Sequence, residues 1–358
     1  MKNILMIFAI ATTAALLVSC SDQLETGTFQ TSVRDFKSVR VLSGTMVADS
    51  LPGIGIAHKV WVGDGILAVA DLKTENLNIF SFPEVRPLKV IDMPYDISKE
   101  GIDFFEIRIK GTLCGMRSRL GGRIDVLTED LALEQVDTGT VYASPYNDAV
   151  YNDVLPVFLD NKYFWFSSVD KRDSVDTRSA YRIRRGSGEA EMICDLELQA
   201  FRGYDMNFFP WGVGTAYKRG KMMVYAYEQF KVVKFVQTRT GKERTLDFFK
   251  YFSNSSDARW KYIWGYYRGQ IHVGRNRIYL SNYEYGLGNL ARIYSTKEFP
   301  FPPFTTVETY SFNGKQLAVY QLDKEGFVSV DEKNRKIYLI DFDDTSVRSY
   351  DIPRKSGR

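Results

Sequence analysis

The sequence of 358 residues is poor in the side chains that most often carry catalysis or bind metals, with three cysteines and two histidines. A zinc site would have to rely on carboxylates, and a catalytic triad could take its base only from His58 or His272. Basic and acidic side chains nearly balance, giving a formal net charge of +3. Because no dense basic patch stands out, the composition gives no support for nucleic-acid binding.

Catalytic motifs are also missing. The patterns HExxH, GxSxG and CxxC do not occur. Residues 214–221 approach the spacing of a phosphate-binding loop, but there is one residue too many, and Met222 stands where Ser or Thr must bind magnesium. No long amphipathic helix is predicted either. The sequence therefore predicts no cofactor and no metal site, and it leaves open whether the protein is an enzyme.

The N-terminus carries the most specific local signal. After Lys2 comes an apolar run from Ile4 to Val18, too short to span a bilayer stably and typical of a secretory signal. The run ends in Leu-Val-Ser before Cys20, which resembles the lipobox of bacterial lipoproteins. That resemblance implies that residues 1–19 are a signal peptide and that the Cys20 thiol receives a diacylglycerol. The alternative is an ordinary secretory signal with a chance cysteine.

The segments that flank the main body are polar. Residues 20–32 are predicted to be a flexible tether between lipid and domain, and residues 354–358 a solvated basic tail. Ser21 follows the cysteine, and by the sorting rule known for some lipoproteins it favours the outer membrane. We therefore expect a lipid-anchored protein of the cell envelope, facing the periplasm or the exterior.

A repeated pattern fills the region between these segments. Apolar runs recur roughly every 50 to 60 residues, each after a turn rich in Gly, Asn or Asp and before another strand of alternating character. The runs are Ile66–Ala70, Leu113–Met116, Tyr163–Phe166, Met222–Tyr225, Ile278–Leu280 and Ile337–Ile340. Continuous apolarity is typical of strands buried on both faces. The pattern predicts an all-β domain over residues 33–353, a single β-propeller of six four-stranded blades.

The two ends of this domain predict how the ring closes. The last copy offers three strands, and a spare strand, Phe36–Leu42, precedes the first copy. Pairing the spare strand into the last blade would remove an exposed sheet edge. We therefore expect a six-bladed β-propeller closed by an N-terminal strand.

Two stretches add a resemblance to a family. Ile66–Phe80 and Lys336–Tyr350 share an apolar run, an Asp, a short turn and a second strand. Both resemble the blade repeats of NHL- and TolB-type propellers. With the lipobox and the six copies, the chain resembles the TolB-like six-bladed propeller lipoproteins of Gram-negative bacteria. The resemblance implies a fold but no catalytic set, and Ser167 and Ser281 depart from it where other copies carry Asp.

Conspicuous single residues have structural interpretations. Asp71 and Asp341 end buried strands beside turns, where a carboxylate accepts backbone N–H groups. Cys114 and Cys194 lie in apolar strand contexts, which favours two buried free thiols over a disulfide.

The candidate ligand-binding residues lie in connections that should gather at one end of the ring. They combine aromatic rings with amide, carboxylate and imidazole groups, which suits a glycan or a peptide. They are His58, Tyr151, Asn152, Asp153, Asn207, Trp211, Tyr283 and Tyr285. The alternative is aromatic packing that plugs the mouth of the channel.

Two functional hypotheses follow from these observations. The first is a non-enzymatic binding or scaffolding module for an envelope protein, a peptide or a glycan, because nothing in the sequence supplies recognisable chemistry. The alternative is a metal-dependent propeller hydrolase or lactonase-like enzyme, to which Asn152, Asp153 and Asn207 could contribute ligands. A purely structural envelope protein is a third possibility.

Overall fold

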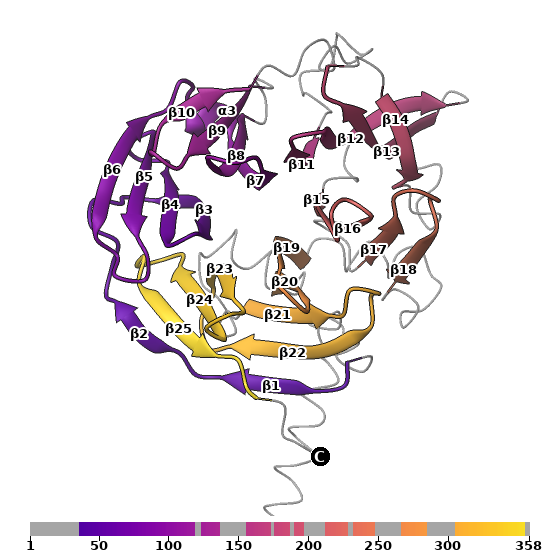
Figure 1. The fold of residues 1–358 in the computed structure, drawn as a ribbon. Coiled ribbons are helices and arrows are strands. Elements are labelled where there is room, and N and C mark those ends of the chain that lie inside the picture. Colours follow the sequence, from indigo (N-terminus) through magenta and orange to yellow (C-terminus); the bar gives the residue numbers. More distant parts are fainter. Residues whose placement is uncertain are drawn as a thin grey trace, which may run out of the picture.

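The computed structural model is built almost entirely of β-strands arranged around a central axis (Figure 1). It describes residues 36–118, 123–136, 155–172, 175–186, 190–196, 212–227, 232–247, 266–284 and 305–354. Within these ranges the single helix is the short α3, Ile97–Glu100. No helix in the described part of the chain is both long and apolar enough to cross a membrane.

The strands form six successive antiparallel groups. Within each group the first strand lies nearest the axis, and the following strands lie progressively further out (Figure 1). The first group consists of β3 (Ala57–Gly63), β4 (Ile66–Asp71), β5 (Asn76–Ser81) and β6 (Pro87–Asp92). The second consists of β7 (Ile102–Arg108), β8 (Thr112–Ser118), β9 (Ile124–Thr128) and β10 (Leu133–Gln135). The third consists of β11 (Leu155–Asp160), β12 (Tyr163–Arg172), β13 (Val175–Arg184) and β14 (Ala190–Asp195). The fourth consists of β15 (Gly212–Tyr217), β16 (Met222–Tyr227), β17 (Val232–Gln237) and β18 (Glu243–Asp247). The fifth consists of β19 (Tyr266–Val273), β20 (Ile278–Glu284), β21 (Thr305–Tyr310) and β22 (Gln316–Leu322). The sixth consists of β23 (Gly326–Asp331), β24 (Lys336–Asp341) and β25 (Val347–Asp351).

The innermost strands close the groups into a ring. Contacts run from β3 to β7, β11, β15, β19 and β23, and from β23 back to β3. Between the second and third groups, β7 and β11 also pair in parallel, with Glu106 opposite Phe158. The all-β propeller fold predicted from the sequence is confirmed.

The second strand of each group explains the repeated apolar runs. In β4 and β24 every residue after the first is buried. Each of the six core clusters joins two neighbouring groups; one, for example, packs Leu67 and Val69 of the first group against Ile340 of the sixth. A strand covered on both faces by neighbouring sheets has no solvent side, so its sequence is continuously apolar.

Asp71 has the structural role expected from its position at the end of β4. Its carboxylate accepts the backbone N–H groups of Gly55 and Ile56, both at 2.8 Å, and of Lys73 at 2.9 Å. Burial raises the pKa of this carboxyl, but the N–H donors and the hydroxyl of Thr74 outweigh burial and hold the pKa below its usual value. Asp71 therefore fastens the chain that enters β3 to the hairpin that follows β4.

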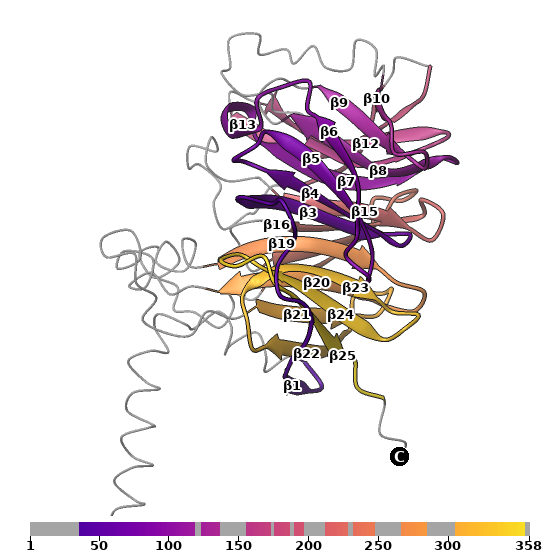
Figure 2. The same cartoon turned by 90° about the vertical axis from the view of Figure 1, so that its left-hand side faces the viewer.

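An N-terminal strand completes the last group, as predicted, but it is not the strand that the sequence indicated. Residues Phe36–Leu42 were expected to enter the last blade, but β1 (Val39–Leu42) pairs in parallel with β22 of the fifth group. The strand that completes the sixth group is β2 (Thr45–Ala48), which pairs antiparallel with β25. The N-terminal segment thus covers two neighbouring sheet edges, and Figures 1 and 2 show it running along the outside of the ring.

Gly44 makes this crossing between the two edges possible. A Cβ at Gly44 would lie 2.7 Å from the buried ring of Tyr350. The backbone N–H of Gly44 and the hydroxyl of Tyr350 both donate to the carboxylate of Asp323, at 3.2 and 2.7 Å. A side chain here would displace either the ring or the strand pair.

We expect Gly44→Val to lower the free energy of unfolding by about 1–3 kcal/mol, because the added side chain overpacks against Tyr350. Urea denaturation of the full chain measures the change. The matched control is Ser43→Val at the exposed neighbouring position. Equal stability of the two variants would contradict a tight crossing at Gly44.

Candidate functional site

One face of the ring collects the starts of all the inner strands. Each four-stranded meander returns the chain to the face from which it set out, so the next inner strand begins on that same face. The parallel pairing of β7 and β11 agrees with this direction. We call this side the loop face.

Long connections begin and end on the loop face. They are residues 137–154, 197–211, 248–265 and 285–304, between β10 and β11, β14 and β15, β18 and β19, and β20 and β21. On the opposite face the β3–β4 hairpin turns within Asp64 and Gly65, with positive φ values of 50° and 76°. Since binding residues tend to lie on loops held by a rigid scaffold, the loop face is the candidate functional surface.

The described candidate residues lie at this face. His58 is the second residue of β3, and Tyr283 is the next-to-last residue of β20, paired with Tyr267 near the start of β19. Other candidates lie outside the described residues: Cys20, Tyr151, Asn152, Asp153, Asn207, Trp211 and Tyr285. The ligand-binding role of all these residues stays a prediction.

The structure adds a polar network on the inner strands that sequence reasoning missed. Asp103 of β7 forms two ion pairs. One is with Lys59 of β3, with Nζ and Oδ1 3.5 Å apart, and the other is with the buried Arg117 of β8, with Nη2 and Oδ2 3.1 Å apart. The carboxylate therefore joins the first and second groups. The only local signal for it is the alternation of polar and apolar residues in β7.

Two further contacts reach past a neighbouring group. The hydroxyl of Thr215 on β15 donates to the carboxylate of Glu106 on β7, beyond β11. The side-chain amide of Gln270 on β19 donates to the carbonyl of Val60 on β3, 3.2 Å away and beyond β23. Side chains therefore link inner strands that lie two groups apart, as well as inner strands of adjacent groups.

The His272 side chain forms a hydrogen bond with a backbone carbonyl. Its Nε2 lies 2.9 Å from the oxygen of Val328, which can only accept, so the neutral ring donates from Nε2. Burial lowers the pKa of His272 to about 4, and the hydrogen bond to Val328 opposes this shift only in part. The imidazole therefore stays uncharged at neutral pH and holds β19 against β23.

The described residues offer no metal centre and no activated thiol. Among them, no three His, Cys, Asp or Glu side chains are grouped so that they could hold one metal ion. Cys114 and Cys194 are both buried and free, as predicted. Burial raises the pKa of Cys194 to about 12, so this thiol is not a thiolate at neutral pH.

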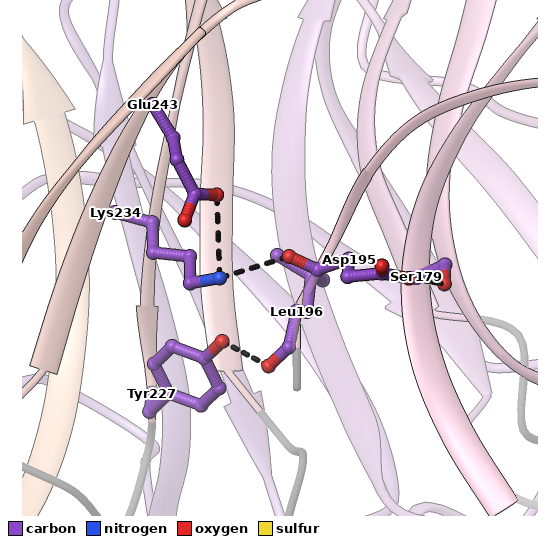
Figure 3. Close-up of polar contacts among 6 residues, drawn as sticks. All are labelled: Ser179, Asp195, Leu196, Tyr227, Lys234 and Glu243. Atoms are coloured by element: carbon purple, nitrogen blue, oxygen red, sulfur yellow. Dashed lines mark hydrogen bonds and ion pairs between the residues drawn. The ribbon is translucent and has the colours of Figure 1, made fainter. Parts of the chain in front are cut away.

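A buried polar cluster lies between the third and fourth groups (Figure 3). Lys234 of β17 is buried, and its ammonium donates to the carbonyl of Asp195, 2.9 Å away, and contacts the carboxylate of Glu243 at 3.4 Å. The hydroxyl of Tyr227 on β16 donates to the carbonyl of Leu196. Neighbouring groups are thus joined by polar contacts as well as by apolar packing.

This cluster fixes the point at which a candidate loop begins. Asp195 and Leu196 are the last described residues before 197–211, the segment that contains Asn207 and Trp211. The carboxylate of Asp195 also accepts the hydroxyl of Ser179, 3.1 Å away. The start of the segment is therefore held by contacts from both adjoining groups.

Glu325 is a buried acid on the same face, between β22 and β23. It is 6% exposed, and its Oε1 has no hydrogen-bond partner in the described structure. Burial, with smaller contributions from Asp343 and Asp341, raises the pKa of Glu325 to about 8. The carboxyl is therefore neutral through most of the physiological pH range.

No protein-family model and no curated protein sequence matches this chain. Among solved structures, a member of the DUF4221 family from Bacteroides vulgatus is similar, with 10% identity and a TM-score of 0.48 over 86% of this chain and 97% of that one. Regucalcin, a calcium-binding protein from Agrobacterium tumefaciens, has 10% identity and a TM-score of 0.47 over 88% and 95%. A luciferin-regenerating enzyme has 11% identity and a TM-score of 0.46 over 85% and 92%.

The activities of these proteins are not carried over to this chain at such similarity. The resemblance to TolB-like lipoproteins drawn from the blade repeats stays a prediction.

The raised pKa of Glu325 predicts a pH dependence of stability. Between pH 4.5 and 8 the unfolded chain loses this proton while the folded chain keeps it, so stability falls as the pH rises. We expect Glu325→Gln to match the wild type at pH 4 and to be more stable at pH 8, by about 1–3 kcal/mol. Thermal unfolding at both pH values measures this, with Glu129→Gln at an exposed position as control. An equal difference at both pH values would contradict the shifted ionisation.

Removing the Tyr227 hydroxyl should loosen the start of the 197–211 segment. Tyr227→Phe leaves the carbonyl of Leu196 without this donor, at a cost of roughly 1–3 kcal/mol. We expect faster proteolytic cleavage within residues 197–211. The matched control is Tyr217→Phe, which removes a hydroxyl bond to the carbonyl of Phe312 on the opposite face. Cleavage at the same rate in both variants would show that Tyr227 does not hold this segment.

Proposed function

We propose that this protein is a lipid-anchored propeller of the cell envelope that acts as a non-enzymatic binding or scaffolding module. Its partner is a protein, a peptide or a glycan bound at the loop face. The observation that carries the proposal is the asymmetry of the ring, in which the long connections 137–154, 197–211, 248–265 and 285–304 all start and finish on one face. A rigid scaffold that presents several loops together suits recognition better than chemistry.

The inner face of the ring supports the same proposal. Lys59 and Arg117 both form ion pairs with Asp103, and Glu106 accepts a hydrogen bond from the hydroxyl of Thr215. Charged groups that are committed to partners within the ring hold the sheets together and are poorly placed to act on a substrate. The alternative, a metal-dependent hydrolase or lactonase, would rest on Asn152, Asp153 and Asn207, which lie outside the described residues.

The lipid anchor is part of the proposal and rests on the Leu-Val-Ser-Cys sequence that ends at Cys20. A diacylglycerol on this residue, followed by the polar segment 20–32, would hold the ring at a membrane through a tether. Labelling of the protein with a fatty acid in a Gram-negative host, lost in Cys20→Ala, tests this part.

Binding at the loop face is tested by cross-linking the full-length protein in its native envelope, followed by mass spectrometry. We expect a discrete partner whose yield falls at least tenfold in Trp211→Ala with Tyr283→Ala. The matched control is Asn161→Ala with Lys162→Ala, two exposed residues in the β11–β12 hairpin of the opposite face. Equal loss in both variants, or no loss in either, would contradict recognition at the loop face. Metal content of the purified protein tests the enzymatic alternative.

A further inference from the structure

The outer edge of the ring carries an exposed apolar arc. Large apolar side chains stand exposed on the outermost strands β1, β2 and β6, which belong to the fifth, sixth and first groups and follow one another around the ring (Figure 1). They are Val39, Val41, Met46, Val47, Leu88 and Val90. Val41 is 70% exposed and Val90 58%, more than most apolar residues of a folded domain. We call these three strands the apolar rim.

Basic side chains are interspersed with these apolar ones. Arg40 lies between Val39 and Val41, and Lys89 lies between Leu88 and Val90, all of them exposed. Exposed acids, Asp49 and Asp92 among them, come at the strand ends. The C-terminal stretch from Arg354 to Arg358 contains three basic residues and no acid, and it follows β25, the strand paired with β2. Successive side chains of a strand point to opposite faces, so β1 and β6 each place apolar side chains on one face and a basic side chain on the other. Basic side chains near a membrane surface are attracted to anionic lipid.

The chain that precedes the ring joins it at this rim. The described chain begins at Phe36, and β1 starts three residues later. The segment from Cys20 to Phe36 can extend roughly 50 Å at most, at about 3.3 Å per residue. A lipid on Cys20 would therefore keep the rim close to the bilayer, at a high effective concentration.

We propose that the apolar rim is a membrane-facing surface, which rests on the headgroup region of an anionic phospholipid bilayer. This inference builds on the lipid anchoring proposed above. Contact through the rim sets the ring edge-on to the membrane, so the loop face stays open to a partner beside the membrane. A flexible lipid anchor alone would let the ring rotate relative to the membrane. Contact through the rim would fix the orientation of the loop face.

The test uses the full-length protein, with the lipid on Cys20 verified by mass. An environment-sensitive fluorophore is attached in turn to Val41→Cys, Val90→Cys and the control Met192→Cys. Met192 is 47% exposed and lies on β14, the outermost strand of the third group, away from the rim. Each labelled protein is reconstituted into vesicles of phosphatidylethanolamine with phosphatidylglycerol, and into vesicles of phosphatidylcholine.

We expect the fluorescence at positions 41 and 90 to rise at least twofold in the phosphatidylglycerol vesicles, with a smaller rise in phosphatidylcholine and no change at position 192. An equal response at all three positions, or none at 41 and 90 in lipidated protein, would overturn the proposal. A response at position 41 that depends on protein concentration without vesicles would also overturn it, because a second copy would then cover the rim.

The proposal of a lipid anchor and the proposal of membrane contact through the rim can be contradicted separately. Protein that carries no lipid on Cys20 contradicts the anchor, and the rim then stands if labels at 41 and 90 still respond to added phosphatidylglycerol vesicles and falls if they do not.

Discussion

Closure of the ring is the constraint on which the rest of this structure depends. Each sheet is covered only by its two neighbours, and the six core clusters all lie between groups rather than within one. A missing neighbour would therefore expose an apolar sheet face to water. The N-terminal strand β2 completes the sixth group by pairing with β25, and β1 covers the outer edge of the fifth group by pairing with β22. The chain thus uses its first strands to secure its last ones.

The same closure supports the candidate site. Because every meander returns to its starting face, the strands that flank the long connections end and begin on one side of the ring. Polar contacts strengthen the strand ends on this face: Asp71 holds the approach to β3, and Lys234 with Tyr227 holds the end of β14, where the 197–211 connection begins. The common face of the long connections and the closure of the ring are therefore consequences of one topology.

Much of the fold could be predicted because burial on both faces produces continuous apolar runs. These runs recur at a regular spacing along the sequence, once in each group. Closure by an N-terminal strand was predicted correctly, but the choice of strand was wrong, since Val39, Val41 and Met46 are exposed and their apolarity says nothing about which edge each strand pairs with. The network on the inner strands was missed for another reason. Glu106 and Thr215 lie far apart in the chain and meet only when the ring is formed, so no local pattern links them.

Native-state hydrogen exchange of the full-length protein tests the closed ring most directly. If closure makes the groups interdependent, the amides of the second strands, from β4 to β24, share a single free energy of opening, equal to that of global unfolding. A graded series, in which the sixth and first groups open at a lower free energy than the third and fourth, would contradict this account. The ring would then behave as an open row of sheets in which each depends only on its nearest neighbour.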